Sequence, residues 1–143
     1  MKKFFASPVS LIAAHITALI LNFGYSVSGN ISPLKWLNFI VTILYLLCLF
    51  MFIKNSKSPK PAVVMYSVIL IASVLIIVFP APYSETLWIE TMITIIGVLL
   101  YCPFAGLQVS LTPLIFKIAV LIISATAITM SVIKIKKRKI RTG

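Results

Sequence analysis

Three ionisable side chains, His15, Glu90 and Lys117, lie inside long apolar stretches of the sequence. An ionisable group is costly in the interior of a membrane and is by default a candidate for function there. His15 could relay a proton or contact a ligand, because an imidazole titrates near neutral pH. Alternatively, it could stay neutral and hydrogen-bond to a neighbouring helix. Since the chain has no second histidine and no carboxylate at mid-depth, we expect this second role.

Glu90 is the first member of a polar stripe whose residues are spaced four, three and four positions apart. That spacing places them on one narrow face of a helix. The stripe consists of Glu90, Thr94, Gly97 and Tyr101. The remaining faces are mostly apolar, whereas an interfacial helix would have a broader charged face. We therefore expect a helix sunk among other helices or at their outer mouth, with Thr94, Gly97 and Tyr101 at helix–helix contacts.

Two asparagines, Asn22 and Asn38, are placed near the outer ends of consecutive antiparallel apolar segments. They fall at matching depth, so an amide–amide hydrogen bond between them is expected. Such a bond would join two helices and contribute about 0.6–2 kcal/mol. Both asparagines are therefore predicted to serve interhelical packing.

The residues that catalysis requires are sparse. Hydrolysis needs a nucleophile, a base and an orienting group, but the chain has one histidine and two acids, Glu85 and Glu90. No GxSxG, Walker A or HExxH pattern occurs, and Cys48 and Cys102 form no CxxC pair. We therefore expect no enzyme, no metal site and no cofactor. A lipid-modifying enzyme with Glu90 as its base is the third-ranked alternative.

The composition is that of an integral membrane protein. Of the 143 residues, 61% are hydrophobic and 10% are charged, whereas soluble domains carry about 25% charged residues. The net charge is +11, from thirteen Lys/Arg against two acids. Basic residues collect in cytoplasmic loops of membrane proteins. Nucleic-acid binding is not expected, since no aromatic or glycine pattern accompanies the charges.

Apolar stretches predict an all-α fold with a single polytopic membrane domain over 1–143. Four spans are expected, at about residues 4–23, 36–53, 62–79 and 114–133. The first stretch also has the form of a signal peptide, but its length favours a span. A fifth stretch, 87–102, would form a helix of about 24 Å, which is short for a span.

Charge distribution selects between two topologies. If 87–102 does not cross the membrane, both termini and eleven basic residues are cytoplasmic, in agreement with the positive-inside rule. If it crosses, the basic tail lies outside and the rule is violated. We therefore predict four spans plus a short embedded or re-entrant helix, with five spans as the alternative. The four-span topology places Glu90 and Lys117 at similar depth, where they could pair directly or through water.

The last span is followed by a basic tail, 134–143. Its six cations are Lys134, Lys136, Lys137, Arg138, Lys139 and Arg141. They mark a cytoplasmic end, and they are the residues expected to contact anionic lipid head groups.

The leading functional hypothesis is a non-catalytic accessory or interaction protein of the plasma membrane. It would be a small subunit of a transporter or sensor complex, or an immunity-type protein. Its expected partners are the lipid bilayer and another membrane protein, or a second copy of itself. A small oligomeric transporter or channel is the alternative, with His15, Glu90 and Lys117 lining an outer vestibule. The Ile- and Lys-rich composition suggests a bacterial source.

Overall fold

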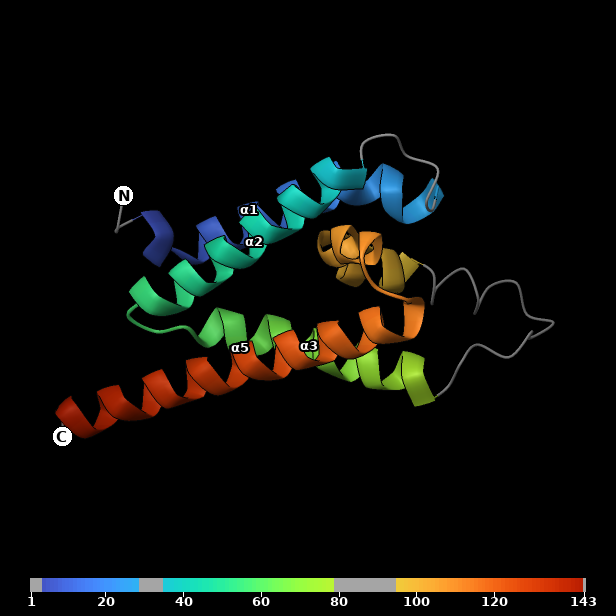
Figure 1. Ribbon diagram of the computed structural model, residues 1–143. Coiled ribbons are helices and arrows are strands. Elements are labelled where there is room, and N and C mark those ends of the chain that lie inside the picture. Colours follow the sequence, from blue (N-terminus) through green and yellow to red (C-terminus); the bar gives the residue numbers. More distant parts are fainter. Residues whose placement is uncertain (1–3, 29–34, 79–94, 143) are drawn as a thin grey trace.

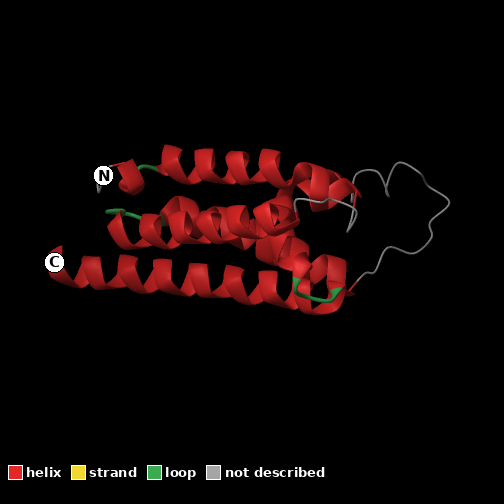
Figure 2. Cartoon of the chain, turned by 45° about the horizontal axis from the view of Figure 1, so that its top comes forward, coloured by secondary structure: helices red, strands yellow, loops and turns green. Residues whose placement is uncertain are grey.

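The computed structural model describes residues 4–28, 35–78 and 95–142. Regular structure in these ranges is entirely helical, which confirms the all-α prediction. The elements are η1 (Phe4–Ala6), α1 (Pro8–Ser28), α2 (Lys35–Asn55), α3 (Lys60–Val78), η3 (Cys102–Val109) and α5 (Pro113–Thr142). Residues 95–101 are α-helical and continue directly into the 3-10 helix η3. Figure 2 shows the long helices running side by side.

The bundle consists of two antiparallel helix pairs with a short helical segment between them (Figure 1). α1 packs along α2, and α3 packs along α5. The segment 95–109 lies between the pairs and contacts α1, α2 and α5. Both chain termini lie at one end of the bundle, called here the terminal end. The segment 95–109 turns back within the bundle, and α5 then starts at the opposite end.

Local sequence signals explain where two of the long helices begin. Ser7 precedes α1, and its hydroxyl accepts a hydrogen bond from the Val9 backbone N–H at 3.3 Å. Pro8 occupies the first helical position, where no N–H is needed. Pro113 occupies the equivalent position in α5. α1 and α5 therefore each begin at a proline, a residue that is favoured at the first position of a helix.

Every long helix buries a stripe of residues spaced three and four positions apart. On α5 the fully buried residues of this stripe are small or β-branched: Val120, Ser124, Ala127 and Ser131. The facing stripe of α3 contains Ala62, Tyr66, Ile69 and Ser73. Small side chains allow helix backbones to approach closely, which is typical of helix contacts in membranes. The small residues lie on the α5 side, and this row of α5 is called here the small-residue seam of the α3–α5 pair.

Within residues 4–28, 35–78 and 95–142, two helices are long and apolar enough to cross a membrane. They contain the stretches Trp36–Asn55 of α2 and Pro113–Ile140 of α5. Shorter apolar helical stretches occur at Pro8–Gly24, Lys60–Leu75 and Ile95–Val109. Many large apolar side chains on the bundle surface are exposed, as in a protein surrounded by lipid. The number of spans remains a prediction.

The helix boundaries differ from the expected ones in three places. α1 continues to Ser28, into a stretch expected to form a loop. α5 continues without a break through the basic segment as far as Thr142, so the expected tail is the end of the last helix. Residues 104–113, which separate the expected short helix from the expected last span, include most of η3. The first half of the expected short helix, 87–94, lies outside the described residues.

Candidate functional site

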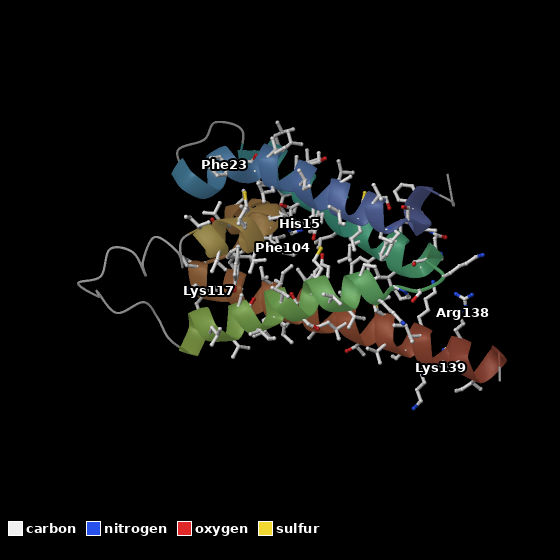
Figure 3. The ribbon with its side chains drawn as sticks, turned by 180° about the vertical axis from the view of Figure 1, so that it is seen from behind. His15, Phe23, Phe104, Lys117, Arg138 and Lys139 are labelled. Atoms are coloured by element: carbon white, nitrogen blue, oxygen red, sulfur yellow. The ribbon has the colours of Figure 1, made fainter. Side chains whose placement is uncertain are left out.

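His15 takes part in a hydrogen-bonded chain that joins three helices and the segment 95–109, which is called here the inserted segment. Its Nδ1 atom lies 2.9 Å from the Tyr45 hydroxyl of α2. Its Nε2 atom lies 3.4 Å from the Leu99 carbonyl oxygen. The Tyr45 hydroxyl lies 2.6 Å from the hydroxyl of Tyr66 on α3. Figure 3 shows His15 in the interior of the bundle, close to Phe104.

The direction of these hydrogen bonds follows from the chemistry of the groups. The Leu99 carbonyl can only accept, so the imidazole N–H must be at Nε2. Nδ1 then accepts a hydrogen bond from the Tyr45 hydroxyl, and the Tyr45 oxygen accepts one from Tyr66. Both tyrosines are buried. A neutral imidazole accounts for all three contacts, and these contacts join different helices. The neutral, hydrogen-bonding role expected for His15 stays a prediction.

A second polar cluster joins α1 and α2 to the inserted segment. Asn22 Nδ2 donates hydrogen bonds to Thr42 Oγ1 at 3.1 Å and to the Pro103 carbonyl at 3.2 Å. The Thr42 hydroxyl donates to the same carbonyl at 3.0 Å and accepts from the Gly106 N–H at 3.2 Å. Asn22 and Thr42 are fully buried. Thr42 therefore uses its one donor and two acceptor positions on three different partners.

The asparagine pair is used differently from the prediction. Asn22 directs both Nδ2 hydrogens to Thr42 and Pro103, and its buried Oδ1 atom has no hydrogen-bond partner. The predicted amide–amide bond to Asn38 is therefore wrong. Asn38 is nevertheless buried at the same contact, where its backbone carbonyl faces Gly106. The inserted segment, which the prediction left out, lies where the second amide was expected.

The remaining predicted residues do not converge on one site. Glu90 and Thr94 lie outside the described residues, so the Glu90–Lys117 pair remains a prediction. A Cβ atom added at Gly97 would meet no atom of the described residues within 4 Å. Tyr101 packs against Phe116 of α5, with ring centroids 6.0 Å apart. Lys117 lies at the opposite end of the bundle from Arg138 and Lys139 (Figure 3).

At the terminal end, two cations of α5 bind backbone carbonyls at the end of α2 and in the α2–α3 connection. Lys134 Nζ donates to the Ile53 carbonyl at 2.6 Å and also to the Lys54 carbonyl. Arg138 donates to the Lys57 carbonyl. The first two carbonyls belong to the last turn of α2, where positive charge is favourable. Lys134 therefore stabilises the end of α2, and Arg138 ties α5 to the α2–α3 connection, in addition to any effect on topology.

A groove of about 300 Å³ runs along the α1–α2 face. Its α1 wall consists mainly of small residues, namely Ser10, Ala13, Ala14, Thr17 and Ala18. Its α2 wall is larger and apolar, with Val41, Leu44, Tyr45 and Cys48. This groove thus combines the small-residue character of the α3–α5 seam with an open face.

Sequence reasoning missed Tyr45 and Tyr66 and gave Thr42 no role. The signal for α2 was present, since Asn38, Thr42 and Tyr45 are spaced four and three positions apart on one helix face. This is the same kind of stripe that was recognised around Glu90. Tyr66 gave no comparable signal, because its neighbours on the buried face of α3, Ala62 and Ile69, are apolar.

Comparison of the chain with protein families, with curated proteins and with solved structures gives no match. Functional inference therefore depends on the geometry of these clusters, the groove and the basic end.

Proposed function

We propose that this chain is a non-catalytic integral membrane protein that acts by associating with another membrane protein, as an accessory subunit of a larger complex. In this proposal α1, α2, α3 and α5 cross the bilayer. The segment 95–109 enters and leaves from the outer side, and both termini are cytoplasmic. The support is that both termini lie at one end of the bundle, together with the basic residues of α5.

The observation that carries the proposal is the open groove between α1 and α2. Small residues are enriched where helices pack in membranes, because they allow close van der Waals contact between backbones. Within this chain the α3–α5 seam uses Ser124, Ala127 and Ser131 in that way. The groove offers a similar small-residue wall, including Ala14 and Ala18, to a helix from outside the described bundle. A transmembrane helix of a partner protein is the occupant that this surface suits.

The polar side chains of the interior support a non-catalytic role. In the His15 chain and the Thr42 cluster, the polar atoms other than Asn22 Oδ1 hydrogen-bond to one another and to backbone groups. In the described ranges, no group of three or more His, Cys, Asp or Glu side chains could hold a metal ion. Polar groups arranged in this way fix the positions of the helices.

The test is site-specific photo-crosslinking in native membranes. A photoreactive residue at Thr17 lies in the groove, whereas one at Ile16 lies on the same exposed helix but outside it. We expect Thr17 to give a discrete cross-linked protein and Ile16 to give only lipid adducts. We also expect Thr17→Trp, but not Ile16→Trp, to abolish co-purification of that protein. Identical behaviour at the two positions would overturn the proposal.

A second candidate function is a small transporter or channel, and one observation favours it. The buried Asn22 Oδ1 atom has no hydrogen-bond partner, and it lies where irregular backbone enters the bundle. Interrupted helices in membranes often form substrate or ion sites. Ion or proton flux in proteoliposomes that Asn22→Leu abolishes would favour this function. Flux equal to that of empty liposomes would exclude it.

A further inference from the structure

A basic cavity lies at the terminal end, between the α2–α3 connection and the last turns of α5. Its volume is about 550 Å³. Its lining includes Lys57 from the α2–α3 connection. From α5 it includes three further cations and two apolar residues: Lys134, Lys137, Arg138, Met130 and Ile133. The only two acids of the chain, Glu85 and Glu90, lie outside the described residues. No described side chain therefore brings negative charge to this cavity.

Two of the four cations that line the cavity, Lys134 and Arg138, are positioned by hydrogen bonds to backbone carbonyls. Lys134 is held by the carbonyls of the last turn of α2, and Arg138 is held by the carbonyl of Lys57. A guanidinium presents a fork of five N–H donors, which can serve a carbonyl and a phosphate together. Because these side chains are already ordered, an anion that enters the cavity loses little free energy to their immobilisation.

The apolar part of the lining indicates what kind of anion fits. Met130 and Ile133 are 42% and 49% exposed. Each lies four residues before a cation, Lys134 or Lys137, so the pairs share one face of α5. On this face of α5 the cations lie nearer the terminal end, and the apolar side chains lie one turn further into the bundle. A molecule with a phosphate at one end and a hydrocarbon chain at the other matches this order.

We propose that this cavity is a discrete site for the phosphate-bearing head group of an anionic phospholipid. The phosphate binds the four cations, and the first part of the acyl chain lies against Met130 and Ile133. This differs from diffuse attraction of a basic tail to an anionic membrane, in which every cation near the surface contributes to a similar degree. In a discrete site, the cations that line the cavity contribute to lipid binding, and nearby cations outside the lining do not.

The chain offers a matched pair of variants for this distinction. Lys57→Gln with Lys137→Gln removes two exposed cations that line the cavity. Lys60→Gln with Lys136→Gln removes two exposed cations from the same end and from the same parts of the chain, neither of which lines it. Lys134 and Arg138 are kept in both variants, because Lys134 also binds the end of α2 and Arg138 also binds the α2–α3 connection.

The experiment uses the full chain in phosphatidylcholine nanodiscs doped with phosphatidylglycerol, with bound lipid measured by native mass spectrometry. We expect the wild-type chain to retain phosphatidylglycerol in preference to phosphatidylcholine. The cavity variant should weaken this retention by about tenfold and the matched variant by less than about twofold. Soluble glycerol phosphate, added as a competitor, should not displace the lipid.

Three results would overturn the proposal. Equal losses in the two variants would mean diffuse electrostatic attraction. Absence of any preference for phosphatidylglycerol would remove the site. Displacement of the lipid by glycerol phosphate at comparable concentration would mean a site for a soluble phosphate ester. None of these results depends on whether a partner protein occupies the α1–α2 groove.

Discussion

Gly106 in η3 lies so close to Asn38 in α2 that a side chain at position 106 would overlap the Asn38 backbone carbonyl. The same added Cβ atom would also lie 2.6 Å from Thr42 Oγ1. A backbone carbonyl cannot move aside as the end of a flexible side chain can, so this contact depends on the absence of a side chain. It brings the Gly106 N–H within hydrogen-bonding distance of Thr42.

The first prediction follows from this contact. Gly106→Ala should destabilise the protein by about 2 kcal/mol or more, because the inserted segment must move away from α2 and lose its hydrogen bonds. The measurement is unfolding in mixed micelles, followed by circular dichroism. Gly97→Ala is the control, since its added methyl group would meet open space and alanine favours the helix. If both variants unfold alike, η3 does not pack against α2 as described.

The second prediction concerns the Thr42 hydroxyl. Thr42→Val keeps the shape of the side chain but removes the group that binds Asn22, Pro103 and Gly106. The Asn22 amide and the Gly106 N–H each lose an acceptor in a buried place, so we expect a loss of about 1–3 kcal/mol in the free energy of unfolding.

Thr129→Val is the matched control for Thr42. Thr129 is exposed, and its hydroxyl bonds only to the Ala125 carbonyl of its own helix turn. Its removal should change stability by less than about 0.5 kcal/mol. A Thr42→Val variant as stable as this control would show that the cluster contributes nothing to holding the inserted segment.

The third prediction separates a structural from a chemical role for His15. His15→Gln can keep a neutral donor and acceptor, so we expect stability within about 1 kcal/mol of the wild type and retained partner association. His15→Leu should lose more, because the Tyr45 hydroxyl would lose its acceptor. Both variants are compared by unfolding in micelles and by co-purification. Loss of association in a stable His15→Gln variant would instead assign His15 to the functional site.

The all-helical fold could be predicted from the sequence, because long apolar runs in a chain with few charges are typical of membrane helices. The position of the polar contacts could not. Thr42 and Pro103 are distant in sequence, and nothing in either stretch indicates that the carbonyl of one will meet the hydroxyl of the other. The two glycines make the same point. Gly97 was selected because it shares a helix face with polar residues, yet the close approach is at Gly106, where the chain turns between α1 and α2.

The extent of α5 was missed for a different reason. Six cations behind an apolar run are a strong topological signal, and that signal says nothing about secondary structure. Lysine and arginine favour helices, so α5 continues to Thr142. Because it continues, Lys134 and Arg138 recur one turn apart on one helix face and reach the α2–α3 connection. A disordered tail would not place them there.

The final prediction tests the four-span topology. Ser110 is exposed at the end of η3, next to the start of α5, whereas Ser58 in the α2–α3 connection and Thr142 lie at the terminal end. In a variant without Cys48 and Cys102, we introduce single cysteines at these three positions and label intact cells with a membrane-impermeant maleimide. Ser110→Cys should react from outside, and Ser58→Cys and Thr142→Cys should react only after the membrane is opened. The physical reason is that, in the four-span topology, 95–109 returns to the end at which it entered, so that α5 would start outside and carry its cations inward. Reaction of Thr142→Cys from outside, with Ser58→Cys protected, would place Ser58 and Thr142 on opposite sides of the membrane. It would require an odd number of crossings between these two positions and contradict the four-span topology.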